Sequence, residues 1–133
     1  MTSNDLRLLT LDGGGVRGLS ALMILQELME KINPHCPPKP CEYFDMIAGT
    51  STGGLIAIML GRLRMSVDES IEAYRLLSDR IFQKKRHRVT VRGKIQGRFD
   101  SEELALAVKK VIKAQGLDEE SLFKDEAVNA CKV

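Results

Sequence analysis

One serine of this chain lies in a sequence pattern that is typical of a catalytic nucleophile. Ser51 is the centre of Gly49-Thr50-Ser51-Thr52-Gly53, a G-x-S-x-G pattern between two apolar runs, 43–48 and 55–60. The pattern predicts a buried strand, a sharp turn with the serine at its tip, and a helix. Small residues beside the serine let the strand and the helix approach each other, and let a substrate carbonyl reach the hydroxyl. A glycine–serine turn without chemistry is the alternative interpretation.

A glycine-rich loop earlier in the chain could supply hydrogen-bond donors to the same reaction. It reads Asp12-Gly13-Gly14-Gly15-Val16-Arg17-Gly18 and lies between a predicted strand and a predicted helix. Successive glycines leave backbone N–H groups facing open space, and the N-terminus of the helix adds a positive dipole end. In such a site Ser51 would attack an acyl carbonyl, and the N–H groups of Gly14 and Gly15 would stabilise the oxyanion.

The same glycines match G-x-G-x-x-G, so a dinucleotide site is a competing interpretation. Such a site needs an acidic residue about 20 positions later, at the end of the second strand, to bind a ribose hydroxyl. That distance falls in the proline-rich segment 37–40, and Glu42 precedes the second predicted strand. The sequence therefore disfavours nucleotide binding. A P-loop is excluded because no Gly-Lys-Ser/Thr follows the glycines.

A serine hydroxyl needs a base, and no histidine is well placed to be one. The chain has two histidines: His35 precedes the serine in a proline-flanked turn, and His87 follows it within a basic run. In α/β hydrolases the base histidine comes last, after an acidic residue. The residues alone thus predict a nucleophile and an oxyanion hole without an evident partner for the serine.

Alternating strands and helices would position these two turns. The apolar patterns predict a strand over 6–11 that is buried on both faces, a stiff proline connector over 37–40, and a second strand over 43–48. Helices are predicted over 19–32, over 52–62, from a capping box at Ser66–Glu69 to about 81, and over 101–114 with Gly116 as its stop. Segment 127–133 resembles the opening of a further strand, so we expect the N-terminal part of a larger domain. The alternation predicts an α/β fold with a mainly parallel sheet, whose ligand sites lie at the carboxyl ends of the strands.

Length and composition indicate a single globular domain over residues 1–133. The chain is 44% hydrophobic and 29% charged, and its net charge of +2 gives no support for nucleic-acid binding. Three cysteines without metal-ligand spacing predict reduced thiols and no metal site. The sequence has no signal peptide, and it has no apolar run of the ~20 residues that a membrane-spanning helix needs. We therefore expect a cytoplasmic protein.

The two glycine-rich turns together resemble those of the patatin-like phospholipase family. The motifs at 12–18 and 49–54 match the family in sequence, in spacing and in their strand–loop–helix setting, and the resemblance is close over roughly the first 65 residues. It implies a three-layer α/β fold whose mainly parallel sheet is flanked by helices. It also implies calcium-independent hydrolysis of phospholipids or related acyl lipids through an acyl-serine intermediate, with a Ser–Asp dyad and no cofactor. By motif, Ser51 is the nucleophile, and Gly13, Gly14 and Gly15 form the oxyanion hole.

The base of that family is an aspartate in an Asp-Gly-Gly or Asp-Gly-Ala turn downstream of the serine, and this chain lacks such a turn. No glycine follows any of the five aspartates after the serine, which are Asp68, Asp79, Asp100, Asp118 and Asp125. Asp68 and Asp100 are predicted helix caps, and Asp12 is predicted to brace the oxyanion loop. We therefore expect the dyad aspartate beyond residue 133 and this fragment alone to be inactive. A non-catalytic lipid-binding or regulatory module is the alternative.

Two sets of basic residues could contact a lipid. Arg17, at the mouth of the first helix, is either a loop-bracing residue or a contact to a lipid phosphate. Segment 84–98 holds seven basic residues and no acidic one, and a solvated loop is its default interpretation. The alternative is peripheral contact with an anionic membrane, worth about 1 kcal/mol per basic residue near the surface. Its first four basic residues would make that contact: Lys84, Lys85, Arg86 and Arg88.

Overall fold

The computed structural model describes residues 5–83, 101–121, 123–124 and 130–133. They fall into two compact units, one formed by 1–72 with 122–133 and the other by 73–121, and the boundary lies within one helix. Both glycine-rich turns belong to the first unit. The basic segment 84–98, with Lys84, Lys85, Arg86, His87 and Arg88, lies outside the described residues, and so do Asp100 and Asp125.

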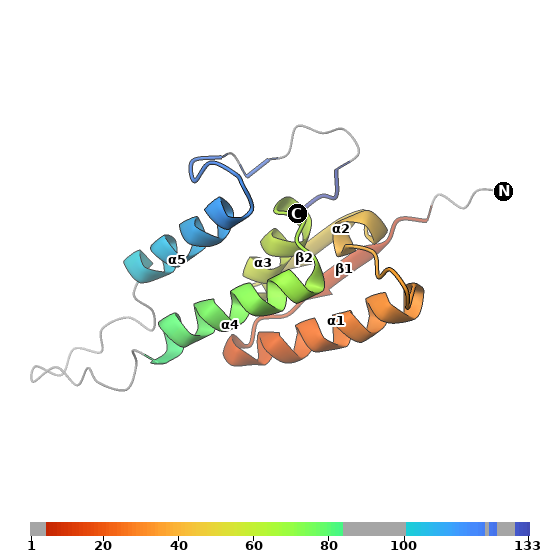
Figure 1. Cartoon of the computed structure of the whole chain (residues 1–133), viewed down its shortest axis with the longest axis horizontal. Helices are drawn as coiled ribbons and strands as arrows, with labels where there is room; N and C mark the ends of the chain where they lie inside the picture. Colours follow the sequence, from red (N-terminus) through yellow and green to blue (C-terminus); the bar gives the residue numbers. More distant parts are fainter. Residues whose placement is uncertain (1–4, 84–100, 122, 125–129) are drawn as a thin grey trace, which may run out of the picture. The chain divides into compact units, whose positions relative to one another are not determined.

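Two parallel strands form the centre of the first unit (Figure 1). Strand β1 (Leu8–Leu11) pairs with β2 (Met46–Gly49), and the register places Leu8 opposite Met46 and Leu11 opposite Gly49. The chain between them forms helices, so the α/β architecture with a parallel sheet that the sequence predicts is confirmed. Since the strands are parallel and in register, the two turns that follow them emerge at the same edge of the sheet.

A third segment of the chain pairs with the other edge of β2. Lys132 forms a parallel bridge with Met46. The N–H of Ile47 donates to the Lys132 carbonyl at 2.8 Å, and the Lys132 N–H donates to the Asp45 carbonyl at 2.9 Å. Strand β2 is therefore hydrogen-bonded on both sides. Of the segment 127–133 that is expected to open a further strand, residues 127–129 lie outside the described residues.

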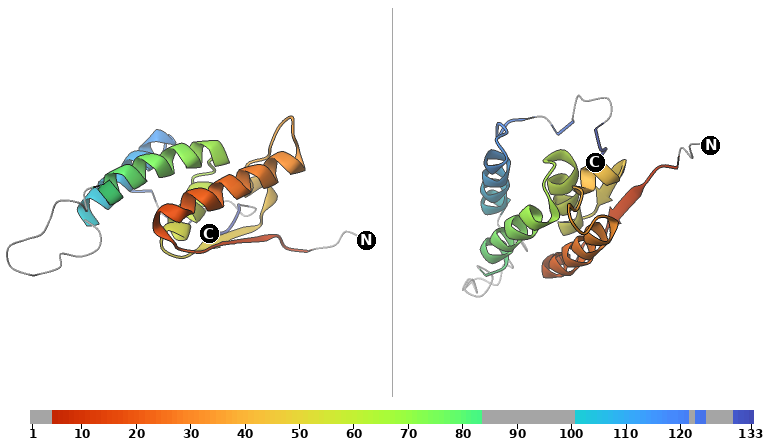
Figure 2. Two further views of the ribbon diagram at one scale, coloured as in Figure 1. Left: turned by 90° about the horizontal axis from the view of Figure 1, so that it is seen from below. Right: turned by 45° about the vertical axis from the view of Figure 1, so that its right-hand side comes forward.

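The sheet is buried on one face only in the part of the chain that the structure describes. Ile47 is fully buried and Leu11 is buried, whereas Leu6 and Leu8 are 83% and 57% exposed. The prediction that the first strand is buried on both faces is therefore wrong for this structure. Helix α1 (Gly18–Ile32) runs along the two strands and buries Leu22, Leu25 and Met29 (Figure 2).

Most helices match their predicted bounds. After the short 3-10 turn η1 (Gly15–Arg17) and α1 come α3 (Thr52–Ala57), the π-helical turn η2 (Ile58–Arg62), α4 (Val67–Gln83) and α5 (Ser101–Ala114). The predicted capping box opens α4, because the Ser66 N–H donates to Glu69 Oε2 at 2.7 Å and the Glu69 N–H donates to Ser66 Oγ at 3.1 Å. Asp68 does not cap that helix: it accepts a hydrogen bond from Gln26 Nε2 of α1.

One helix was not predicted from the sequence. Segment 40–43 forms α2 (Pro40–Tyr43) and is neither connector nor strand, so the strand begins at Met46 instead of at 43. Proline is favoured at the first position of a helix, because its fixed φ suits the turn and its missing N–H is not needed there. Glu42 adds to the start of α2, since its carboxylate accepts the Lys39 N–H at 3.1 Å.

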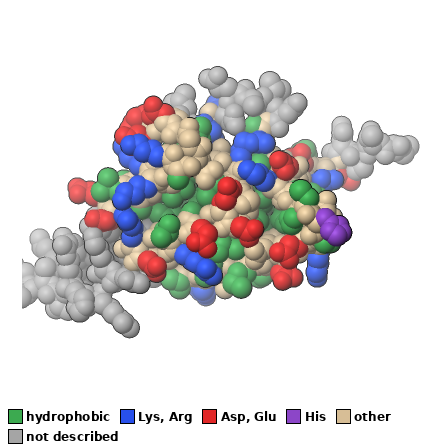
Figure 3. Space-filling model, in the orientation of Figure 1, with side chains coloured by type: hydrophobic (Ala, Val, Ile, Leu, Met, Phe, Trp, Pro, Cys, Tyr) green, Lys and Arg blue, Asp and Glu red, His purple; other side chains and the backbone are tan. Residues whose placement is uncertain are grey.

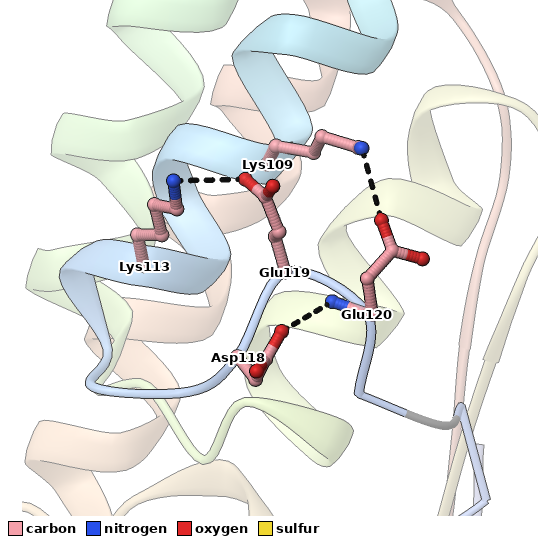
Figure 4. Close-up of polar contacts among 5 residues, drawn as sticks. All are labelled: Lys109, Lys113, Asp118, Glu119 and Glu120. Carbon is pink, nitrogen blue, oxygen red and sulfur yellow. Dashed lines mark hydrogen bonds and ion pairs between the residues drawn. The ribbon is translucent and has the colours of Figure 1, made fainter.

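An ion-pair cluster follows α5 in the second unit (Figure 4). Lys113 pairs with Glu119 at 2.9 Å, and Lys109 pairs with Glu120 at 3.2 Å. The Lys113 partner lowers the pKa of Glu119, and the Glu120 partner raises the pKa of Lys109. Asp118 Oδ1 accepts a hydrogen bond from the Glu120 N–H at 2.9 Å, so its carboxylate is used within the local turn.

Gly116, with φ of 74°, ends α5 as predicted.

Hydrophobic side chains also lie among charged ones on the surface of α1 (Figure 3). Met23 and Ile24 are 54% and 71% exposed, and Leu28 is 44% exposed. The buried face of α1 is therefore narrower than the apolar period of its sequence predicts, because Leu28 and also Ile32, which is 37% exposed, fit that period but lie at the surface.

Two buried thiols predict how the stability of this chain depends on pH. Burial raises the pKa of Cys41 and of Cys131. The folded state therefore holds these protons to a higher pH than the unfolded state does. The stability that they contribute is fully present below the thiol pKa of the unfolded chain, about 8.5, and is lost as the pH rises through the folded-state values.

We expect Cys41→Ala to flatten the fall in unfolding free energy between pH ~7 and ~10. Urea unfolding at a series of pH values measures this slope. Cys36→Ala is the matched control, because Cys36 is exposed, and it should leave the slope as in the wild type. Equal slopes for wild type and Cys41→Ala would contradict the account.

Candidate active site

Ser51 lies at the tip of the turn between β2 and α3, and its side chain is exposed. Its backbone has φ of 54° and ψ of −125°, which L-amino acids adopt rarely. Such a conformation costs about 1–3 kcal/mol and persists only where the surrounding structure enforces it. Backbone strain at the serine is the feature expected of a nucleophile elbow.

Glycines enforce this turn by allowing backbone to touch backbone. A Cβ atom on Gly49 would lie 2.2 Å from the carbonyl oxygen of Gly53. A Cβ atom on Gly53 would lie 2.3 Å from the carbonyl oxygen of Leu11 and 2.8 Å from that of Asp12. Gly53 therefore packs directly on the end of β1. No residue other than glycine fits at either position without moving a strand.

The structure brings the predicted glycine-rich loop against the serine. A Cβ atom on Gly13 would lie 2.9 Å from Ser51 Cβ and 3.6 Å from Ser51 Oγ. The strand register explains this contact, because Leu11 lies opposite Gly49 and two residues later Gly13 comes level with Ser51. The Thr50 N–H donates to the Leu11 carbonyl at 3.2 Å and so extends the strand pairing into the turn.

Two threonine hydroxyls hold the loop to the serine turn. The Gly13 N–H donates to Thr50 Oγ1 at 3.3 Å, and the Gly14 N–H donates to Thr52 Oγ1 at 3.2 Å. Thr52 is buried, whereas Thr50 is exposed. The sequence pattern predicts both threonines only as small residues beside the serine. The signal that could identify them is a hydroxyl acceptor on each side of the serine, level with a loop rich in backbone N–H donors.

Arg17 folds back on the glycine loop. Its Nε donates to the Gly14 carbonyl at 3.4 Å, and its backbone N–H donates to the same carbonyl at 3.2 Å. Gly15, with φ of 59°, begins the turn η1 between them. In this structure Arg17 is an exposed side chain whose guanidinium lies against the loop.

The sequence profile of the patatin-like phospholipase family matches residues 9–128, which include both turns and nearly the whole chain. This chain belongs to that family. The residues that match the family include the glycine loop and the serine turn, and both lie in the first unit of the fold.

Individual patatin-like relatives are similar over the first part of the chain. Calcium-independent phospholipase A2-gamma of Mus musculus is 45% identical over 78 residues, which are 58% of this chain and 9% of the relative. Phospholipase A I of Arabidopsis thaliana is 44% identical over 78 residues, or 58% of this chain and 6% of the relative. The cGAMP-activated phospholipase of Escherichia coli (strain TW11681) is 44% identical over 57 residues, which are 41% of this chain and 16% of the relative. The chain thus spans less than a fifth of each of these relatives, and no solved structure matches it significantly.

The described residues of this patatin-like chain place no base at the serine. Among them, no carboxylate or imidazole is hydrogen-bonded to Ser51. His35 lies in the turn after α1, where its N–H donates to Asn33 Oδ1 at 3.1 Å. Asp68 and Asp118 are engaged elsewhere, as described above. The same residues contain no cluster of metal-ligating side chains and no helix long and apolar enough to cross a membrane.

The close contacts at the elbow predict which glycines tolerate a methyl group. Gly49→Ala and Gly53→Ala should each lower the free energy of unfolding by about 3 kcal/mol or more, since the clash is with backbone and no rotamer change relieves it. Gly54→Ala is the matched control. Its Cβ atom would lie 3.3 Å from the Gly49 carbonyl oxygen, and alanine is favoured in a helix, so a loss below about 1 kcal/mol is expected. Urea denaturation measures all three, and equal stabilities would refute the packing account.

Proposed function

We propose that this chain carries the nucleophile and the oxyanion hole of a serine-dependent lipid acyl hydrolase of the phospholipase A type. The observation that carries the proposal is the contact between Gly13 and Ser51, which places a loop of backbone donors directly against a strained, exposed serine. Membership of the patatin-like phospholipase family supports the same chemistry. The relatives named above are phospholipases by name.

In the proposed reaction Ser51 Oγ attacks the carbonyl carbon of an acyl ester and gives its proton to an aspartate base. The carbonyl oxygen becomes an oxyanion, and collapse of the tetrahedral intermediate breaks the ester C–O bond. The leaving alcohol takes the proton from the aspartate. Water then repeats the sequence on the acyl-serine, giving its proton to the aspartate and releasing a fatty acid, and Ser51 recovers its proton.

We place the oxyanion at the loop formed by Gly13, Gly14 and Gly15. In this structure the Gly13 and Gly14 N–H groups donate hydrogen bonds to the hydroxyls of Thr50 and Thr52, at 3.3 and 3.2 Å. These distances are long for an N–H···O bond, whose usual value is about 2.9–3.0 Å. An oxyanion is a stronger acceptor than a neutral hydroxyl, so it would share these donors with the threonine hydroxyls, which keep the amides oriented. Losing one such donor typically costs about 3–4 kcal/mol of transition-state stabilisation.

The dyad aspartate is proposed to lie outside the 133 residues of this sequence, because no Asp-Gly pair follows Ser51. The substrate is proposed to be a phospholipid or another acyl lipid. Arg17 is close enough to the glycine loop to meet a lipid phosphate, since its guanidinium already reaches Gly14. Peripheral contact with an anionic membrane would use Lys84, Lys85, Arg86 and Arg88, in a cytoplasmic protein.

A non-catalytic lipid-binding or regulatory module is the second candidate. The observation that favours it is that no base is hydrogen-bonded to Ser51 among the described residues. The two candidates differ in one property, because only the hydrolase makes Ser51 nucleophilic.

Covalent labelling separates these candidates. In the intact protein, including whatever sequence follows Val133, a fluorophosphonate probe should label the wild type, and Ser51→Ala should abolish both labelling and esterase activity. Ser20→Ala, an exposed serine of α1, is the matched control and should be labelled like the wild type. Labelling that survives Ser51→Ala would identify another nucleophile. A folded wild type that is never labelled would favour the non-catalytic module.

A further inference from the structure

The hydroxyls of Thr50 and Thr52 flank the nucleophile and bind two successive amides of the glycine loop. We infer that both threonines are positioning residues: their hydroxyls fix the oxyanion loop in register with Ser51. This inference rests on the proposed function, since the loop needs a fixed orientation only if it stabilises a developing charge.

The two hydrogen bonds restrain two neighbouring peptide planes. The Gly13 N–H belongs to the peptide that joins residues 12 and 13, and the Gly14 N–H belongs to the next one. Each plane is held by a different hydroxyl, at 3.3 and 3.2 Å. A single bond would leave the neighbouring plane free to rotate, whereas two bonds from either side of Ser51 fix the direction of both amides relative to the serine.

The Gly13 and Gly14 amides need such restraints because the three glycines have no side chains to orient them, and Arg17 holds only the Gly14 carbonyl. Glycine populates more backbone conformations than any other residue, so three in succession form the least restrained backbone available. Oxyanion stabilisation depends on donors that are already oriented when the charge develops. Gly13 is in contact with Ser51, so a rotation of its peptide would change the donors at the reacting atom directly.

Packing alone does not explain both threonines. Thr52 is buried, and its hydroxyl could serve the stability of the fold as well as the orientation of Gly14. Thr50 is exposed, so water can replace its hydrogen bond at little cost in stability. What water cannot replace is the fixed direction of the Gly13 amide. A substitution of Thr50 can therefore distinguish a positioning role from a structural one.

The test compares valine with serine at each position. Valine keeps the shape of threonine but removes the acceptor, and serine keeps the hydroxyl. Thr10→Val is the matched control, because Thr10 is an exposed threonine of β1 away from the turn. In the intact protein we expect Thr50→Val and Thr52→Val to lower the maximal rate of Ser51 phosphonylation by a fluorophosphonate about 10–100-fold, with the half-saturating concentration within about twofold. The serine variants should restore the rate, and Thr10→Val should not change it.

A second readout does not depend on reactivity. The amide ¹H–¹⁵N signals of Gly13 and Gly14 should shift in the corresponding valine variant and return in the serine variant. Valine variants that fold and react at the wild-type rate or faster would overturn the inference and leave the proposed function standing. A wild type with these amide signals that is never labelled would overturn the proposed function, and the inference with it. If Thr52→Val does not fold, Thr50→Val decides the question.

Discussion

The approach of one backbone to another at Gly49 and Gly53 is the constraint on which the rest of the site depends. These glycines let the start of α3 touch the end of β2 and the end of β1, at distances that leave no room for a Cβ atom. That contact forces the chain through a turn too tight for ordinary backbone angles, and Ser51 takes the strained position. Because Gly53 rests on the last carbonyls of β1, the same contact fixes where the glycine loop begins.

A strained backbone costs about 1–3 kcal/mol, and residues that retain such strain cluster at functional sites. Here the strain is concentrated in one residue, and the surrounding interactions are ordinary: strand pairing that continues to Thr50, a helix start, and two threonine hydrogen bonds. The site is therefore built by local backbone packing. The exposed face of the sheet, with Leu6 and Leu8, takes no part in it.

Features set by neighbouring residues could be predicted from the sequence. The bounds of α1 and α5, the capping box before α4 and the strand–turn–helix at Ser51 follow from local apolar periods, caps and glycines. The sequence does not predict helix α2, because the proline cluster at 37–40 has the composition of a stiff connector, although Pro40 is suited to start a helix.

Features set by distant residues could not be predicted in this way. Burial on both faces of β1 depends on a covering layer that the strand sequence does not encode. The threonine bonds join residues 37 and 38 positions apart, so they become visible only once the register of β1 and β2 is known. The base of the reaction remains a prediction, because no described residue is hydrogen-bonded to Ser51 as a base would be.

The central claim is that the glycine loop receives the charge that develops at Ser51. A crystal structure of the intact protein phosphonylated at Ser51 tests it most directly, because the phosphonyl oxygen stands in for the oxyanion. We expect that oxygen within about 2.7–3.1 Å of at least one backbone nitrogen of Gly13, Gly14 or Gly15. A phosphonyl oxygen that points into solvent with no loop amide in reach, or an adduct on a different residue, would contradict the account.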